Sequence, residues 1–134
     1  YGKGEILLMD DDPMIRKVAG NMIEHLGYTV VFALDGIDAL KIYEDALQSG
    51  HPFEAVVMDL TIPGGMGGKE AIRELLGMDP GAKVIVSSGY SNDQVMADYK
   101  SYGFSGVVLK PYRIEELGVA LKNVIDMKKT ETVS

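Results

Sequence analysis

Polar side chains follow four of the five short apolar segments in this 134-residue sequence. In an open sheet of parallel strands the carboxyl ends of the strands meet at one edge, where ligands bind, so we expect these side chains to lie together. Crowded carboxylates repel one another unless a cation neutralises them, and Mg²⁺ takes carboxylate and phosphate oxygens as ligands. Phosphoryl transfer requires a nucleophile and groups that neutralise the charge of the phosphoryl oxygens. A carboxylate would supply the nucleophile, and the cation, a hydroxyl and an ammonium group would neutralise the charge. The residues are Asp10, Asp11 and Asp12 after the first segment, Asp59 after the third, Ser87 and Ser88 at the end of the fourth, and Lys110 after the fifth.

Simpler interpretations of the same residues stay open at this point. Residues 10–12 would only cap the following helix, because Asp is favoured at helix N-termini. Asp59 and the two serines would be turn residues, and Lys110 would be an ordinary surface lysine. Their joint occurrence at matching strand ends favours a shared site with Asp59 as the phosphoryl acceptor. A chain without cysteine and without a suitably placed histidine does not fit zinc.

A glycine-rich stretch, DLTIPGGMGGKE, begins at Asp59 and does not match a nucleotide-binding P-loop. The P-loop pattern G-x-x-x-x-G-K-[ST], aligned on Gly68 and Lys69, requires a glycine where Pro63 stands and a Ser or Thr where Glu70 stands. We therefore interpret the stretch as one wall of the pocket around the acceptor. Its glycines allow positive φ angles and predict a mobile backbone there.

The five apolar segments are typical of parallel strands that are covered on both faces. Their centres lie roughly 25 residues apart, which leaves room for one crossover helix after each. Apolar residues recur at helical spacing between them, such as Ile15, Val18 and Ile23 after the first, and Ser91 with Gln94 resembles a capping box before the fourth helix. The pattern predicts one α/β domain over residues 1–134, with frayed ends and helices on both faces of the sheet. The strand segments are Ile6–Met9, Val30–Phe32, Ala55–Met58, Val84–Val86 and Val107–Leu109.

The bulk composition limits the classes of function. A net charge of −7 argues against a nucleic-acid partner. The sequence has no run of about 18 apolar residues, so we expect no membrane contact by this domain, and the first apolar stretch is too short for a signal peptide. The absence of cysteine fits a cytoplasmic location. The chain begins with Tyr1 instead of Met, which is compatible with a fragment of a longer protein.

Four segments, taken in order, resemble the receiver domains of two-component response regulators and hybrid histidine kinases. ILLMDDDP resembles the first strand and acidic cluster of that family, MDLTIPGGMGG its phosphoacceptor strand and loop, VIVSSGYS its fourth strand and switch segment, and VVLKPY its Lys-Pro signature. The resemblance covers residues 5–125 of the chain and is strongest to the C-terminal receiver of a hybrid sensor histidine kinase. It implies an α/β, flavodoxin-like (βα)5 three-layer sandwich with a parallel five-stranded sheet in the order 2-1-3-4-5.

The resemblance also implies a mechanism. Asp59 would accept a phosphoryl group from a phosphohistidine of a histidine kinase or a histidine phosphotransfer domain, with Mg²⁺ as the cofactor. The phosphorylated site would switch the face formed by the fourth and fifth strands, through which a homodimer could form. The domain would be a phosphoacceptor with slow self-dephosphorylation and not an enzyme in its own right. The implied Mg²⁺ ligands are Asp10, Asp11, Asp59 and the backbone carbonyl of Thr61, the implied phosphoryl contacts are Ser88 and Lys110, and the Lys110–Pro111 peptide would be cis.

One position departs from the family pattern in a way that bears on switching. Val107 stands where many receivers carry a Tyr or Phe that rotates inward on activation. Either Tyr90 or Tyr112 would then take over that role, or the output would depend on backbone movement alone. Tyr90 also flanks the path of the attacking water in this family, and its bulk predicts slow hydrolysis of the acyl phosphate.

Two other classes of function remain as alternatives. A receiver-like docking module would never be phosphorylated, and absence of Mg²⁺ affinity would favour it; intact Asp59, Ser88 and Lys110 argue against it. An aspartate-nucleophile phosphatase would carry D-x-D-x-[TV] after its first strand, but Met14 stands where Thr or Val is required. Turnover of a chromogenic phosphate ester would identify that enzyme.

Overall fold

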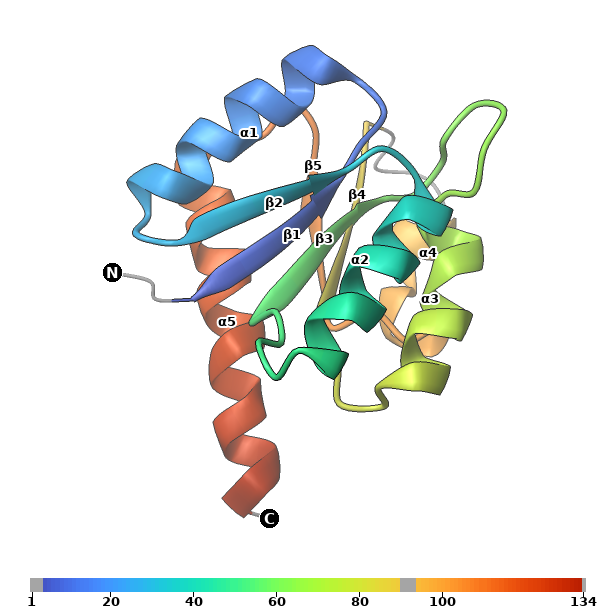
Figure 1. The fold of residues 1–134 in the computed structure, drawn as a ribbon. Coiled ribbons are helices and arrows are strands. Elements are labelled where there is room, and N and C mark those ends of the chain that lie inside the picture. Colours follow the sequence, from blue (N-terminus) through green and yellow to red (C-terminus); the bar gives the residue numbers. More distant parts are fainter. Residues whose placement is uncertain (1–3, 90–93, 134) are drawn as a thin grey trace.

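The computed structural model describes residues 4–89 and 94–133, with side chains as far as residue 127. Strands and helices alternate along the chain, and the sheet forms the middle of three layers (Figure 1). Within these described residues, no helix is both long enough and apolar enough to cross a membrane. The strands are β1 (Glu5–Met9), β2 (Thr29–Ala33), β3 (Ala55–Asp59), β4 (Val84–Ser88) and β5 (Gly106–Leu109). The helices are α1 (Pro13–His25), α2 (Gly36–Gln48), α3 (Gly68–Met78), α4 (Gln94–Ala97) and α5 (Ile114–Val133), with a short 3-10 helix, η1 (Tyr99–Tyr102), after α4.

The sheet has five parallel strands in the order β2-β1-β3-β4-β5. Helices α1 and α5 cover one of its faces, and α2, α3 and α4 cover the other (Figure 1). The predicted flavodoxin-like sandwich and its strand order are therefore confirmed. Because every strand runs in the same direction, all five carboxyl ends lie at one edge of the sheet.

Each face of the sheet carries its own apolar core, since alternate residues of a strand point to opposite faces. In β1, Ile6 and Leu8 belong to the core beneath α1 and α5, whereas Leu7 and Met9 belong to the core beneath α2 and α3. All four side chains are fully buried. Burial on both faces explains why β1 is an unbroken apolar run in the sequence.

The segment after β4 differs from the predicted crossover helix. Its described residues hold the four-residue α4 and then η1, and the chain leaves helical geometry between them at Asp98, whose φ is −126° and ψ is 43°. The Asp98 carboxylate accepts a hydrogen bond from Ser101 Oγ at 2.8 Å, a local bond that competes with continuation of the helix. Gly103, with a φ of 103°, then turns the chain toward β5. The predicted capping box of Ser91 and Gln94 lies partly outside the described residues.

A partly buried hydrogen bond joins the middle of α2 to the C-terminal end of α3. The hydroxyl of Tyr43 donates to Asp79 Oδ2 at 2.6 Å, and Asp79 is the residue at which α3 ends. Burial raises the pKa of the Tyr43 hydroxyl well above its usual range, and the hydrogen bond to Asp79 raises it further. The hydroxyl therefore remains protonated and keeps donating to the carboxylate.

We expect Tyr43→Phe to lower the free energy of unfolding by about 1.5–3 kcal/mol, the contribution of a hydrogen bond to a charged group. The ring would stay stacked on Phe53, whose centroid lies 6.0 Å away, so that packing is preserved. Urea denaturation followed by circular dichroism measures the change. Tyr102→Phe is the control, because the described residues show no hydrogen-bond partner for its hydroxyl. Equal midpoints for the two variants would show that the Tyr43–Asp79 bond contributes nothing.

Candidate functional site

The acidic residues that follow β1 and β3 meet at the carboxyl edge of the sheet. Carboxylate oxygens of Asp10, Asp11 and Asp59 all lie within 4.8 Å of one another. The strand register brings the fourth strand alongside, because Asp59 pairs with Ser87 and the next residue, Ser88, pairs with Leu109 of β5. The expected convergence of the strand ends is therefore present in the fold.

Lys110 bridges two of the three carboxylates. Its Nζ lies 3.1 Å from Asp10 Oδ2 and 3.1 Å from Asp59 Oδ2. The Lys110 side chain is only 16% exposed, and the side chains of Asp10 and Asp59 are 1% and 9% exposed. The interpretation of Lys110 as an ordinary surface lysine is therefore wrong, because its ammonium group is inside the site.

The three consecutive aspartates have separate positions. Asp12 caps α1, because its carboxylate accepts hydrogen bonds from the backbone N–H groups of Met14 at 2.9 Å and Ile15 at 3.5 Å. Asp10 is fully buried and its Oδ1 accepts from the N–H of Asp12 at 3.0 Å. Asp11 is exposed to solvent at the rim. Capping is thus the role of Asp12 alone, and the other two carboxylates are available to the cluster.

Burial dominates the electrostatics of Asp59. It raises the pKa of the Asp59 carboxyl above its usual value; the ammonium of Lys110 opposes this rise, and the negative charge of Asp10 adds to it. Burial by itself would lower the pKa of Lys110, but the charges of Asp59 and Asp10 outweigh it and raise that pKa. The site therefore holds a positively charged lysine between two carboxylates that are largely removed from water.

The donor set of the cluster fits a hard divalent cation. Three carboxylates and one ammonium leave a net charge of about −2 in the ionised site. All the candidate ligands are oxygens, which Mg²⁺ prefers, and the exposed position of Asp11 opens the cluster to solvent. The backbone N–H of Thr61 also acts on Asp59, because it lowers the pKa of that carboxyl.

The glycine-rich loop packs tightly against the backbone at the end of β3 and just after it. A Cβ atom on Gly67 would lie 2.4 Å from the carbonyl oxygen of Leu60, and one on Gly68 would lie 2.9 Å from that of Asp59. Of the four glycines in residues 64–68, Gly64 alone has a positive φ, of 75°. The expectation of positive φ angles is confirmed at that one position, whereas close approach of two backbones explains the glycines at the start of α3.

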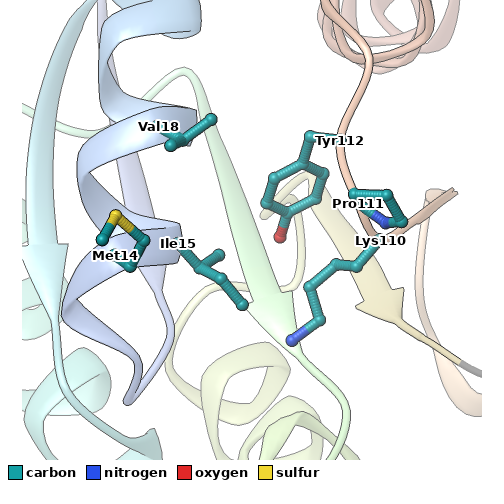
Figure 2. A pocket seen from close by; sticks show the side chains of 6 residues that line it. All are labelled: Met14, Ile15, Val18, Lys110, Pro111 and Tyr112. Atoms are coloured by element: carbon teal, nitrogen blue, oxygen red, sulfur yellow. The ribbon is translucent and has the colours of Figure 1, made fainter.

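An apolar groove opens beside the acidic cluster, between α1 and the segment that joins β5 to α5 (Figure 2). Its volume is about 350 Å³, and Met14 and Val18 on its α1 side are 67% and 45% exposed. The predicted stripe of α1 is therefore divided, because Val18 is exposed in the groove whereas Ile23 of the same stripe is buried against the sheet. The i, i+4 spacing of Met14 and Val18 was the available signal of a second stripe. The lining residues are Met14, Ile15, Val18, Lys110, Pro111 and Tyr112.

Two contacts of the site were not predicted from the sequence. Arg16 Nη1 donates to the backbone carbonyl of Asp10 at 2.7 Å, and the hydroxyl of Tyr112 donates to Ser87 Oγ at 2.8 Å. No sequence signal indicates either, because both join residues of different elements. The predicted cis peptide between Lys110 and Pro111 is confirmed.

The residues expected to act in switching are only partly described. Val107 is half-buried against the core beneath α2 and α3. Tyr90, which we expected either to replace the missing aromatic residue or to slow hydrolysis, lies outside the described residues. Tyr112, the other candidate, is 8% exposed and is hydrogen-bonded to Ser87.

Comparison with known proteins identifies relatives over nearly the whole chain. Residues 6–122 match the family model described as the response regulator receiver domain. The chain is 30% identical over 125 residues to the sensor kinase CckA of Brucella abortus, and it spans 13% of that protein. It is 28% identical over 119 residues to the chemotaxis protein CheY of Listeria monocytogenes, and it spans 95% of that protein.

The solved structures that resemble the chain have the same fold. The receiver domain of a sensor histidine kinase from Pseudomonas aeruginosa matches with a TM-score of 0.80 and 26% identity, over 93% of this chain and 99% of that one. That structure was determined with a magnesium ion coordinated in its active-site cleft.

Proposed function

Since this chain belongs to the response regulator receiver domain family, we propose that Asp59 is its phosphoacceptor and that Ser88 and Lys110 bind the transferred group. Receiver domains are phosphoacceptors of two-component signalling, and they interact with histidine kinases and phosphotransfer domains. The observation that carries the proposal is the position of Asp59, a buried carboxylate at the carboxyl end of β3 whose Oδ2 lies 3.1 Å from Lys110 Nζ.

In the proposed reaction an Asp59 carboxylate oxygen attacks the phosphorus of a partner's phosphohistidine. The new bond joins phosphorus to that oxygen, the bond from phosphorus to the imidazole nitrogen breaks, and the imidazole leaves with its electron pair and takes up a proton. Lys110 is already within contact distance of Asp59 and would neutralise charge on the phosphoryl oxygens. The hydroxyl of Ser88, which ends β4, would donate a hydrogen bond to one of these oxygens.

We propose that Mg²⁺ is held by Asp10, Asp11, Asp59 and the backbone carbonyl of Thr61. The clustering of three carboxylates within 4.8 Å supports this assignment. A bound Mg²⁺ ion would offset the repulsion between the phosphoryl oxygens and the carboxylates. Asp10 is buried and held in place by two contacts, from Lys110 Nζ and from the N–H of Asp12, so it would form the fixed side of the metal site.

The groove beside the cluster is our proposed docking place for the helix that carries the phosphohistidine. Its two exposed apolar side chains, Met14 and Val18, lie on α1, and its opposite wall ends at Lys110, which contacts Asp59 (Figure 2). A helix seated in the groove would bring one of its side chains next to the acceptor. Docking there would exclude water from the site during transfer.

Phosphorylation would then act on the face of β4 and β5. A dianionic group on Asp59 would draw Ser88 and Lys110 toward it and shift the balance between two arrangements of this face. Leu109, at the end of β5, and Val119, on α5, are apolar side chains that are 41% and 59% exposed, which supports a role of this side of the molecule in output or in homodimer formation. A place at the C-terminal end of a hybrid histidine kinase is also part of the proposal, since the match to CckA covers only 13% of that longer protein.

Incubation with acetyl phosphate and Mg²⁺, followed by intact-mass measurement, tests the proposed function without an identified partner. We expect a gain of about one phosphoryl group, lost when Mg²⁺ is removed with EDTA. Absence of any gain in a protein with native circular dichroism would contradict the proposal and favour the docking module. Continuous release of phosphate from a chromogenic ester would instead favour a phosphatase.

Binding of Mg²⁺ to the native state is expected to raise the melting temperature. At ten times the dissociation constant, a ligand that binds only the native state adds about 1.4 kcal/mol to the free energy of unfolding. Asp11→Asn should reduce this gain, because it removes one carboxylate of the cluster. Asp45→Asn is a matched control on the exposed surface of α2. A Mg²⁺-dependent shift that is the same in both variants would place the cation elsewhere.

A further inference from the structure

Tyr112 lies between the groove and the interior of the sheet. Its ring lines the groove opposite α1 (Figure 2), and its hydroxyl donates to Ser87 Oγ at 2.8 Å. Tyr112 is 8% exposed and Ser87 is fully buried. The hydrogen bond therefore links the wall of the groove directly to β4.

A second hydrogen bond joins the same two segments. The backbone N–H of Lys110 donates to the carbonyl of Ser88 at 2.9 Å. The segment of residues 110–112 is thus attached at both of its ends to two consecutive residues of β4. Because the ammonium of Lys110 contacts Asp59, any change at Asp59 that moves Lys110 relative to β4 must also act on Tyr112.

Ser87 is itself adjacent to the acceptor. Its Cα is paired with that of Asp59 across the sheet, and its carbonyl accepts a hydrogen bond from the N–H of Leu60 at 2.8 Å. A shift of Ser87 would therefore also move the backbone next to Asp59 and the neighbouring residue Ser88.

The hydroxyl of Tyr112 is a permanent donor under physiological conditions. Burial raises its pKa well above the usual range; the bond to Ser87 opposes this rise, and the charges of Asp10 and Asp59 add to it. The hydroxyl therefore stays protonated, and the bond depends on geometry and not on the ambient pH.

We propose that the Tyr112–Ser87 hydrogen bond couples the groove to the phosphoryl site, with Tyr112 as the positioning residue that transmits the state of Asp59 to the groove surface. The inference rests on the proposed function of Asp59. Because coupling between two sites is reciprocal, an occupant of the groove would also change how readily Asp59 is phosphorylated. A merely structural role, in which the bond only satisfies a buried hydroxyl, would affect stability and leave the two sites independent.

Methyl NMR of protein labelled at its methionines separates these roles. Beryllofluoride with Mg²⁺ serves as the probe, because it mimics a phosphoryl group on a carboxylate. Met14 reports on the groove, which it lines at 67% exposure. Met66 reports on the loop after β3, since its carbonyl accepts from Gly36 within that region. In the wild-type protein we expect beryllofluoride to shift both methyl resonances.

Two substitutions remove the bond from opposite ends. Tyr112→Phe keeps the ring in the groove wall and loses the hydroxyl, whereas Ser87→Ala removes the acceptor and leaves the groove lining unchanged. In each variant we expect the Met14 shift to fall to about half or less of the wild-type shift, while Met66 keeps its full response. The double variant should lose no more than either single one, because both changes remove the same interaction.

Each outcome decides between the possibilities. A full Met14 shift in both variants would overturn the coupling, even if both variants are less stable. A reduced Met14 shift in Tyr112→Phe alone would also overturn it, because it would indicate an effect of the ring. Additive losses in the double variant would also contradict a shared bond. If beryllofluoride shifts neither methyl in the wild-type protein, the proposed function of Asp59 fails, and the coupling fails with it.

Discussion

Replacing Asp59 with asparagine is expected to abolish phosphoryl transfer from acetyl phosphate. The amide has nearly the shape of the carboxylate but lacks a nucleophilic oxygen anion, and loss of a nucleophile costs about 10³-fold or more in rate. The fold should persist, because Lys110 keeps its contact with Asp10 and the amide fills the same space as the carboxylate. Intact-mass measurement after incubation with Mg²⁺ and acetyl phosphate gives the result directly.

The matched control for this experiment is Asp12→Asn. Asp12 is close to the cluster in sequence, but its carboxylate caps α1, and Asn caps helices about as well as Asp. We therefore expect this variant to be phosphorylated like the wild-type protein and to unfold at the same urea concentration. A phosphoryl group found on the Asp59→Asn protein would show that the acceptor is a different residue, and peptide mapping would then identify it.

A single methyl group at Gly67 is expected to lower the free energy of unfolding and to distort the site. The Cβ of Gly67→Ala would lie 2.4 Å from the Leu60 carbonyl oxygen, 2.9 Å from Thr61 Cα and 3.0 Å from the backbone nitrogen of Ile62. All three atoms belong to the backbone, so the loop after β3 must shift. Overpacking of this kind costs about 1–3 kcal/mol. The same shift displaces Thr61, so we also expect slower phosphorylation by acetyl phosphate at limiting Mg²⁺.

Gly77→Ala, near the C-terminal end of α3, gives the opposite expectation. A Cβ at Gly77 meets no atom within 4 Å, and alanine is the better residue in a helix by about 0.5–1 kcal/mol. Urea denaturation of the two variants should therefore move the midpoint in opposite directions from that of the wild-type protein. Shifts of the same sign and size would mean that the contact between Gly67 and residues 60–62 is not tight.

The location of the site could be predicted from the sequence because it follows from topology. Once the five apolar runs are taken as parallel strands, the residues that follow them must share one edge. No knowledge of side-chain packing was needed to place Asp10, Asp59 and Lys110 together. The sequence therefore predicts their shared location, whereas the contacts of Lys110 with both carboxylates are seen only in the structure.

The details that escaped prediction all depend on how one element lies against another. Val18 fits the helical stripe of α1, and only the rotation of that helix on the sheet shows that it faces the groove. The bond between Tyr112 and Ser87 joins positions 25 residues apart. The glycines at 67 and 68 were taken as sources of flexibility, whereas two of their neighbours in space are backbone carbonyls. None of these facts has a local signature in the chain.

The order of the strands also has a consequence for how the protein folds. Parallel strands cannot pair through a tight hairpin, and β1 must wait for β3, with Ile6 pairing with Ala55 about 50 residues later. The ion pair of Asp10 with Lys110 closes a span of 100 residues. A nascent or locally unfolded chain thus contains every residue of the acidic site but not the site itself. The domain consequently becomes able to receive a signal only when nearly the whole chain has folded. Phosphorylation of this domain therefore also reports that it is folded.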